Sequence, residues 1–311
     1  MMKNLWSVFI GLIIFFILVE VSFRIYGLFL KPDLKISKDV FKIVCIGDSS
    51  TYGLGASKPS YAYPAQLQKL LETNNKVQVI NLGLPGINSS QGLELFSKNI
   101  SRIFPQVIIV CIGINDPWNL EQSNIIRFYE SKGLMKFNLY LKYYISNLKF
   151  IRFLKLILIS SEDKKSNKDF PIPSFSRDTI FKNNKLMPVQ AEQNNALRKN
   201  YAYNFKEYVK LAEKYDSKIY FLEYHAPGWQ NPQTIIHEIY NELNLNVIKI
   251  YDFFERMDNS NNDIRSADGW HLNDKGYEIL AKIICNNLKD KIALNCPFFI
   301  LKMEPDTKNE Q

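Results

Sequence analysis

The chain has 311 residues, enough for one large α/β domain with appendages or for two small domains. Its hydrophobic content of 46% and aromatic content of 14% can fill a sizeable core, which excludes global disorder. The formal net charge is +8, but much of the excess lies after Lys132 and no recognisable nucleic-acid motif accompanies it. We therefore expect no nucleic-acid partner, because a membrane surface or plain solubility explains the charge at least as well.

The amino-terminal segment is almost wholly apolar over Leu5–Val19, and Glu20 and Arg24 then lie four residues apart, close enough to pair on one helix face near a headgroup boundary. A membrane-spanning helix needs about 20 apolar residues, and no small-x-small cleavage site follows this run. We therefore predict an uncleaved single-pass anchor at residues 1–30, rather than a signal peptide or a buried core helix. The flanking basic residues do not favour an outward-facing carboxyl-terminal domain. They are Lys3 before the span and Arg24, Lys31 and Lys35 after it.

A polar linker at residues 31–41 precedes apolar runs that alternate with segments of helical periodicity. The predicted strands are Lys42–Ile46, Val77–Leu82, Val107–Ile112, Lys218–Leu222 and Val247–Tyr251. The predicted helices are Tyr63–Leu71, Gly92–Ile103, Ala202–Lys214, Thr234–Leu243 and Asp274–Leu288. This alternation is typical of an α/β fold in which helices cover both faces of a parallel sheet. Ligands of such folds bind at the carboxyl ends of the strands.

A domain at residues 42–295, followed by a tail at 296–311, is interrupted by an expected helical and loop insertion at 118–200. Within the insertion, Gly133–Ile159 reads as an apolar helix without acidic residues, and Ser160–Asp178 reads as a loop. Two interpretations of the helix stay open. It caps the site and rests on an anionic membrane surface, or it packs on the domain with its lysines in solvent. Its basic residues are Lys132, Lys136, Lys142, Lys149, Arg152 and Lys155.

The four cysteines lack the spacing of metal ligands, and we expect neither a metal nor a nucleotide or other cofactor. Cys45 and Cys111 fall in predicted buried strands, where free cysteine behaves as a small apolar residue. Cys285 and Cys296 bracket the end of the last helix and could pair in an oxidising compartment, although spacing alone does not establish a disulfide.

Two short segments carry the residue types of nucleophilic catalysis. The first predicted strand runs into Gly47–Gly53 (GDSSTYG), and Asp268–His271 (DGWH) supplies a carboxylate and an imidazole. A serine hydroxyl is a weak nucleophile unless a base takes its proton, and that base works best when a third group holds its tautomer. Only three histidines can act as the base: His225, His237 and His271.

The other two histidines have simpler interpretations. His225 follows the fourth predicted strand and either lines the crevice or is a hydrogen-bonded loop residue, and His237 lies in an amphipathic helix and is structural or exposed. Side chains that could line the crevice with His225 are Tyr224, Pro227 and Trp229.

Together with Asn81–Gly86 (NLGLPG) and Gly113–Asp116 (GIND), these segments resemble the four blocks of the SGNH (GDSL) hydrolase superfamily, over roughly Phe41–Leu288 without the insertion. The resemblance implies a three-layer α/β/α, flavodoxin-like domain with a five-stranded parallel sheet. It implies Ser49 as the nucleophile, His271 as the base and Asp268 as the acid that orients it. It also implies an oxyanion hole made of the amides of Ser49 and Gly86 and the side chain of Asn115, with Gly83 as an alternative to Gly86.

Four residues near these blocks carry further expectations. Asp48 is a candidate substrate-binding residue, with a loop-bracing acceptor as the alternative, and Trp118 is either a substrate platform or a core residue. Ser50 and Thr51 are expected to cap the segment that follows them.

The resemblance implies a serine esterase that removes acyl groups, acetyl among them, from a carbohydrate- or lipid-type substrate. By analogy with the family, the catalytic domain is expected on the extracytoplasmic side of the membrane, anchored by the amino-terminal helix. One alternative is an O-acyltransferase that modifies a cell-envelope glycan with the same serine. Another is a non-catalytic glycan-binding protein that has kept the fold, against which the complete set of site residues argues. Oligomeric state and acyl chain length stay open.

Overall fold

The structure is a computed structural model that describes residues 2–29, 34–151, 153–154, 190–225, 230–259 and 263–289. The chain divides into two compact units. The first comprises Met1–Ile36 and Ser131–Met187, and the second comprises Ser37–Glu130 and Pro188–Gln311. All of the candidate site residues belong to the second unit.

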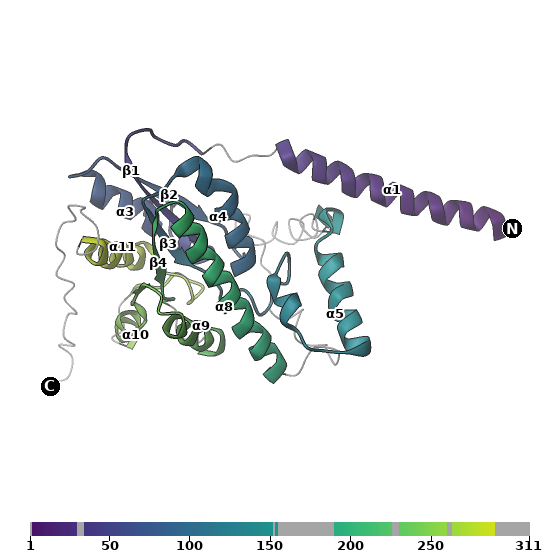
Figure 1. Cartoon of the computed structure of the whole chain (residues 1–311). Coiled ribbons are helices and arrows are strands. Elements are labelled where there is room, and N and C mark those ends of the chain that lie inside the picture. The colour runs from purple at the N-terminus through teal and green to yellow at the C-terminus, as the bar shows by residue number, and fades with distance from the viewer. Residues whose placement is uncertain are drawn as a thin grey trace. The chain divides into compact units, whose positions relative to one another are not determined.

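Five parallel strands form the central sheet of the second unit, in the order β2-β1-β3-β4-β5 (Figure 1). The strands are β1 (Phe41–Gly47), β2 (Val77–Gly83), β3 (Val107–Cys111), β4 (Lys218–Leu222) and β5 (Val247–Ile248). Every pairing between neighbours is parallel. This is the flavodoxin-like strand order, so the predicted α/β fold with a five-stranded parallel sheet is confirmed.

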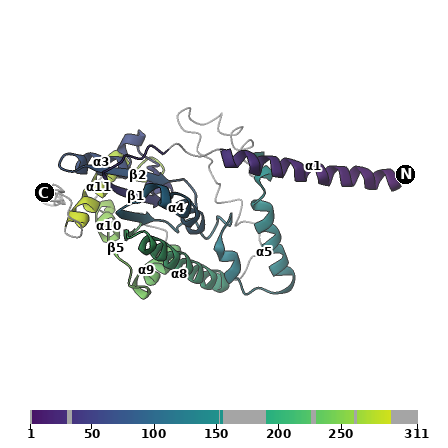
Figure 2. The same ribbon diagram turned by 45° about the horizontal axis from the view of Figure 1, so that its top comes forward.

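Helices cover both faces of this sheet. In Figure 1, α3 and α11 lie on one side, whereas α4 and α8 lie on the other, and Figure 2 shows α9 beside α8. The helices of the second unit are α2 (Ser49–Tyr52), α3 (Tyr63–Glu72), α4 (Ser89–Ile103), α8 (Gln190–Lys214), α9 (Gln230–Glu242), α10 (Tyr251–Asn259) and α11 (Asp274–Lys289). Short 3₁₀ turns lie at Pro59–Tyr61 and Asn124–Phe128.

The core lies where the apolar strands meet the apolar faces of these helices. Strands β1 and β3 are fully buried over Ile43–Ile46 and Val107–Val110, which explains why both read as unbroken apolar runs. Aromatic side chains fill the space between β4 and the helices beside it, because Phe221 of β4 contacts the rings of Phe205 on α8 and Tyr240 on α9. This packing fixes the carboxyl ends of the strands, which carry the site.

Local capping interactions set where two of the helices begin. The Asn88 side chain accepts a hydrogen bond from the backbone N–H of Gln91, and the Gln91 side chain accepts one from the backbone N–H of Asn88. This reciprocal capping box starts α4 at Ser89, three residues earlier than the apolar periodicity predicted. The side chain of Asn273 caps α11 in a similar way by accepting from the N–H of Gly276.

Several boundaries differ from the sequence-based expectation. Strand β5 ends at Ile248 and α10 begins at Tyr251, because the Glu223 carboxylate accepts hydrogen bonds from the N–H groups of Ile250 and Tyr251 and turns the chain. Helix α10 was not predicted. Helix α8 begins at Gln190, inside the residues assigned to the insertion.

The first unit contains α1 (Met2–Phe29) and α5 (Gly133–Ser146). One stretch of α1, Ile10–Gly27, is long and apolar enough to cross a membrane by length and composition, a property that it shares with signal sequences. The expected pair of Glu20 and Arg24 is present at 2.8 Å.

The basic segment after Lys132 is not one continuous helix. Helix α5 ends at Ser146, a turn follows, and the backbone is helical again at 149–151 and 153–154. Asn147 closes α5, since its side-chain amide donates to the carbonyl of Tyr143. The predicted loop at Ser160–Asp178, Arg152 and Lys155 lie outside the described residues.

Candidate active site

Ser49 begins α2 directly after β1, at the carboxyl edge of the sheet. Asp48 is the N-cap of this short helix, and its side chain accepts a hydrogen bond from the N–H of Ser50 at 3.0 Å. Asp48 therefore does the capping that was expected of Ser50 and Thr51, which lie inside α2 and are buried. The N–H of Ser49, at the first position of the helix, has no acceptor within the helix and remains available for another oxygen.

His271 and Asp268 lie on the loop before α11 and form a chain of contacts that reaches Ser49. The His271 Nε2 lies 2.8 Å from the Ser49 Oγ, and the His271 Nδ1 lies 2.5 Å from the Asp268 Oδ2. The other Asp268 oxygen accepts from the backbone N–H groups of Trp270 and His271 and from the hydroxyl of Ser266. The structure therefore brings together the three residues that the sequence named.

Electrostatics keep Asp268 ionised. Partial burial acts to raise the pKa of this carboxyl, but the hydrogen bonds from His271, Trp270 and Ser266 outweigh it and hold the pKa well below its usual range. The side chains of Asp268 and His271 are 42% and 19% exposed, so water reaches the site. A charged carboxylate on Nδ1 and a hydroxyl on Nε2 suit a histidine that takes a proton from the serine.

Asp48 holds the turn at Ser49 through hydrogen bonds of both its carboxylate oxygens. Its side chain is fully buried, and its second oxygen accepts a hydrogen bond from the hydroxyl of Tyr224. Tyr224 follows β4, and its hydroxyl also accepts from the N–H of Ile114, which follows β3. Burial raises the pKa of Asp48 to about 6, although these hydrogen bonds oppose the shift. The Asp48 contacts match the loop-bracing alternative, and none of its surface is open to a substrate.

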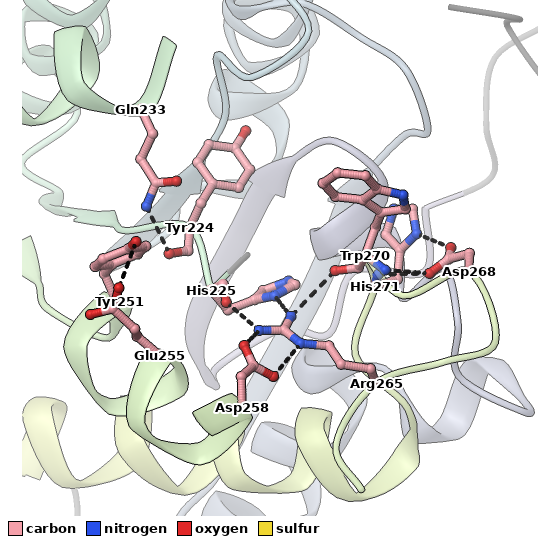
Figure 3. Close-up of polar contacts among 10 residues, drawn as sticks. All are labelled: Tyr224, His225, Gln233, Tyr251, Glu255, Asp258, Arg265, Asp268, Trp270 and His271. Carbon is pink, nitrogen blue, oxygen red and sulfur yellow. Dashed lines mark hydrogen bonds and ion pairs between the residues drawn. The ribbon is translucent and has the colours of Figure 1, made fainter. Parts of the chain in front are cut away.

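Arg265 connects three segments around the His271 loop (Figure 3). Its guanidinium donates to both carboxylate oxygens of Asp258 at 2.8 and 2.5 Å. It also donates to the His225 carbonyl at 2.6 Å, to the His225 Nδ1 at 2.7 Å and to the Trp270 carbonyl at 3.3 Å. A guanidinium has five N–H donors, so every donor of Arg265 has an acceptor. Arg265 was missed in the sequence because a single arginine outside a motif carries no signal there.

His225 matches the hydrogen-bonded loop histidine that the sequence left as an alternative. It is buried, and its Nδ1 accepts from Arg265, which leaves the proton of the neutral ring on Nε2. Burial and the Arg265 charge both lower the pKa of His225 well below its usual value. Pro227 and Trp229 lie outside the described residues. His237, on α9, is half-buried and lies 3.9 Å from the Glu223 carboxylate.

A glycine allows the His271 loop to lie against the loop that follows α2. Gly55 has a φ of +93°, and a Cβ placed there would come within 2.9 Å of the His271 Cβ and 2.6 Å of the Leu272 carbonyl oxygen. No other residue fits that space without moving His271. Tyr277 of α11 reinforces the same contact, because its hydroxyl donates to the carbonyl of Leu54 at 2.7 Å.

Gly83 and Gly86 have different surroundings. Gly83 ends β2, and its N–H donates to the Asn81 side chain at 2.8 Å. A Cβ at Gly83 would lie 2.3 Å from the Tyr52 backbone nitrogen, so this glycine lets β2 approach α2. The carbonyl of Gly86 accepts from the Asn119 side chain at 2.7 Å. The N–H of Gly86 belongs to the preceding peptide group and takes no part in that hydrogen bond. Because the Gly83 N–H already has an acceptor, the N–H of Gly86 is the better candidate of the two for an external oxygen.

Asn115 and Trp118 follow β3. The Asn115 side chain is nearly buried and uses its amide to donate to the Ile87 carbonyl at 3.0 Å, which ties the loop after β3 to the loop after β2. An amide has two N–H donors, so a second remains for a ligand. Trp118 is partly exposed, and its backbone N–H donates to the Asn115 carbonyl. Asn119, which holds both Gly86 and Gln91, was not singled out in the sequence.

Asp116 is the centre of a buried polar cluster behind the site. It accepts hydrogen bonds from the N–H and hydroxyl of Ser89, at the start of α4, and from the Asn200 side chain of α8 at 2.6 Å. Asn204 donates to the Ser89 hydroxyl at 2.7 Å. Burial raises the pKa of Asp116 to about 7, against the opposing effect of these hydrogen bonds. The cluster locks α4 and α8 to the loop that carries Asn115.

Cys45 and Cys111 are free and buried. Cys285 of α11 is disulfide-bonded, and Cys296, its suggested partner, lies outside the described residues. Among the residues that the structure describes, no group of three or more His, Cys, Asp or Glu side chains could hold a metal ion.

A serine, a histidine and a carboxylate in hydrogen-bond contact at the carboxyl edge of a parallel sheet are the arrangement of serine hydrolases. A sequence profile of the GDSL-like lipase/acylhydrolase family matches residues 45–279, about three quarters of the chain. The chain therefore belongs to this family and is an esterase of the SGNH (GDSL) type. The resemblance that the sequence motifs carry is confirmed.

Solved structures to which this chain is similar include a lipase/acylhydrolase from Enterococcus faecalis, at 16% identity and a TM-score of 0.46, covering 83% of this chain and 98% of that one. An acetyl xylan esterase from Geobacillus stearothermophilus matches at 16% identity and a TM-score of 0.46, covering 82% and 97%. A two-domain esterase active on acetylated mannans matches at 15% identity and a TM-score of 0.48, covering 86% and 53%. No curated protein sequence matches this chain.

Proposed function

We propose that this chain is a serine esterase in which Ser49 is the nucleophile, His271 the general base and acid, and Asp268 the group that orients His271. The contact of His271 Nε2 with Ser49 Oγ at 2.8 Å is the observation that carries this proposal. Asp268 stabilises the imidazolium that forms, because its depressed pKa keeps it a carboxylate.

The reaction follows from these contacts. The Ser49 Oγ attacks the acyl carbon while its proton moves to the His271 Nε2, and the carbonyl oxygen becomes an oxyanion. The tetrahedral intermediate collapses when the bond to the alcohol oxygen breaks and that oxygen takes the proton from His271. A water molecule then gives a proton to the His271 Nε2 and attacks the acyl carbon. The bond between that carbon and the Ser49 Oγ breaks, the Oγ takes the proton back from His271, and the carboxylic acid leaves. The open face beside Asp268 and His271 gives water access to this second step.

Three donors form the proposed oxyanion hole: the N–H groups of Ser49 and Gly86 and the side-chain amide of Asn115. The support is that Ser49 is the first residue of α2, that Asn119 holds the carbonyl that follows the Gly86 N–H, and that Asn115 is held through one amide hydrogen. Gly83 is set aside because its N–H already donates to Asn81. Donors fixed before the reaction each lower the barrier by about 3–4 kcal/mol.

We further propose that the substrate is an acyl ester, preferably an O-acetyl ester, on a carbohydrate- or lipid-type molecule of the cell envelope. We also propose that α1 is an uncleaved single-pass anchor and that the esterase unit lies outside the cytoplasm. The apolar window Ile10–Gly27 of α1 supports the anchor. The disulfide-bonded Cys285 supports the location, because disulfides persist in oxidising compartments. Trp118, half-exposed after β3, is the proposed platform for the alcohol part of the substrate.

The test is turnover of p-nitrophenyl acetate and of O-acetylated envelope polymers by the full-length chain in detergent, with released acetate measured by mass spectrometry. Ser49→Ala and His271→Ala should each lose about 10³-fold or more in kcat/KM. Ser97→Ala, which changes an exposed serine of α4, is the matched control and should be unaffected. Unchanged turnover in Ser49→Ala would end the proposal. Appearance of acylated sugar in place of acetate when an acceptor sugar is added would assign the O-acyltransferase activity instead.

A further inference from the structure

Helix α5 carries an apolar stripe that no part of the described chain covers. The side chains of the stripe are between 44% and 68% exposed. Their spacing of three or four residues places them on one face of the helix. Leu139, which lies on a different face, is buried. The stripe consists of Leu134, Phe137, Leu141, Tyr144 and Ile145.

The charges around the stripe have one sign. Lys132, Lys136 and Lys142 are exposed, and the sequence has no acidic residue from Lys132 to Ile159. An apolar face with lysines beside it and aromatic residues along it is the pattern of a helix that lies in the interface of a membrane with anionic lipids. A partner protein with an acidic surface would match the lysines but would leave the apolar stripe in contact with polar groups.

The chain that follows α5 contacts the proposed anchor within the first unit. The N–H of Phe150 donates to the Glu20 carboxylate at 3.1 Å. The ring of Phe150 lies 5.4 Å from that of Phe16, and the ring of Phe153 lies 5.0 Å from that of Phe23. Figures 1 and 2 both show α5 running crosswise to α1. If α1 crosses a bilayer, a helix crosswise to it runs along the membrane plane.

The depth of this contact agrees with an interfacial position. Glu20 and Arg24 follow the apolar run Leu5–Val19 and fall in the second half of the window Ile10–Gly27, so a span that places this run in the hydrocarbon brings their ion pair towards the headgroups on that side. Because Phe150 bonds to Glu20, the segment that directly follows α5 is held near that level. The exposed lysines of α5 would then lie among lipid phosphates.

We propose that α5 is an interfacial helix that lies in the plane of an anionic leaflet beside the anchor, with its stripe among the upper acyl chains and its lysines at the headgroup phosphates. This inference rests on the proposed anchor at α1. The occupant of the stripe is lipid, and a second copy of the chain or residues 155–189 of the same chain are the competing occupants. The second contact with the membrane would limit rotation of the first unit about the anchor.

The test uses the full-length protein in vesicles of phosphatidylcholine, with and without phosphatidylglycerol. An environment-sensitive dye is attached to the cysteine of one of three variants: Leu141→Cys on α5, Ile14→Cys on α1, or Phe104→Cys on the esterase unit. The native side chains at these three positions are exposed. The wild-type chain is the labelling blank, since Cys45 and Cys111 are buried and Cys285 is disulfide-bonded. Brominated lipids and aqueous iodide then report whether each dye is in lipid or in water.

The dye at Leu141 should be quenched by brominated lipid, more strongly with phosphatidylglycerol present, while the dye at Phe104 should be quenched by iodide alone. Lys142→Glu should lower the inserted-to-free ratio of α5 by about fivefold or more, because each lysine near an anionic surface contributes about that factor. Lys98→Glu, which changes an exposed lysine of α4, is the matched control.

Lipid quenching at Ile14 without lipid quenching at Leu141 would overturn the inference and leave the anchor standing. Failure of both positions would overturn the anchor as well, and protection of Leu141 from both quenchers would assign the stripe to another part of the protein or a second copy.

Discussion

The His271 Nε2 lies 2.8 Å from the Ser49 Oγ, although 222 residues separate the two in the chain. The contact exists because Ser49 lies at the start of α2, just after β1, and His271 lies on the loop before α11, so that the two meet at the carboxyl ends of the strands. Asp48 with Tyr224 supports the serine, whereas Asp268 with Ser266 supports the histidine. The first support is buried and the second is a hydrogen bond within the loop, so the reacting pair is held before a substrate arrives.

Replacement of Asp268 by asparagine should reduce kcat by about 10³–10⁴-fold, because an amide cannot hold the Nδ1–H tautomer of His271 or stabilise an imidazolium. Ser266→Ala is the matched control. It removes one donor to Asp268 but keeps the bond to His271, so its loss should be much smaller. Steady-state kinetics on p-nitrophenyl acetate measure both, and equal losses in the two variants would show that Asp268 acts through the loop rather than through His271.

The wild-type pH profile should contain no titration of Asp268 between pH 4 and pH 9. Its hydrogen bonds hold the pKa well below the usual value, so the carboxylate is charged over that whole range. Because its pKa is lower in the folded protein than in the unfolded chain, the Asp268 carboxylate stabilises the fold at pH values above the unfolded pKa of about 3.9. This contribution is lost only as the pH falls through the folded-state pKa. Unfolding of wild type and Asp268→Asn at pH 3, 5 and 7 tests this. A difference in unfolding free energy that kept rising between pH 5 and 7 would contradict it.

Loss of the Asn115 amide should lower kcat by about 10²–10³-fold with little change in KM, because the donor is strongest when charge develops on the carbonyl oxygen. The variant is Asn115→Ala, and Asn99→Ala on α4 is the control. The Asn115 amide also donates to Ile87, so thermal unfolding must show that the variant is folded at the assay temperature. A rise in KM with kcat unchanged would place Asn115 in ground-state binding instead.

Arg265→Lys should lower kcat by roughly 10- to 100-fold, since a lysine has no rigid fork to hold Asp258, His225 and Trp270 together and the His271 loop loses its position. Arg256→Lys, which changes an exposed arginine of α10, is the control. Labelling of Ser49 by a phosphonate, measured beside turnover, separates a displaced His271 from an unfolded protein. Turnover equal to that of Arg256→Lys would remove Arg265 from the positioning network.

The stabilising contribution of the buried Asp116 should fall as pH rises, which is the opposite of the pH dependence expected for Asp268. Its folded-state pKa is raised to about 7, so the folded protein holds a proton that the unfolded chain loses near pH 3.9. Its contribution is present below that value and is lost as pH rises to about 7. The stability advantage of wild type over Asp116→Asn should therefore shrink between pH 5 and pH 8, by an amount on the order of a few kcal/mol. Urea unfolding at the two pH values measures it, with Asp252→Asn as the exposed control, and an advantage that grew with pH would contradict the assignment.

The strands and the reacting residues could be predicted because their signals are local. Apolar runs such as Val107–Val110 are visible as sequence, and the scarcity of histidine made His271 easy to select. Their contact follows from a general rule of parallel sheets, since loops at the carboxyl ends of the strands meet at one edge.

The supports of the site could not be predicted, because they depend on how loops fold back on one another. Arg265 donates to His225, which lies 40 residues earlier, and Asn119 donates to Gly86, 33 residues earlier. Neither residue type has a preferred role at its position. The early end of β5 has the same origin, because Glu223 accepts from Ile250 and Tyr251, which lie 27 and 28 residues later.

The most direct measurement is covalent labelling of the full-length chain with an alkyl fluorophosphonate, followed by peptide mass spectrometry. We expect one stoichiometric adduct on Ser49, with labelling abolished in Ser49→Ala and slowed by about 10³-fold or more in His271→Ala. An adduct on another serine with turnover intact, or labelling at the wild-type rate in His271→Ala, would contradict the proposal that His271 activates Ser49.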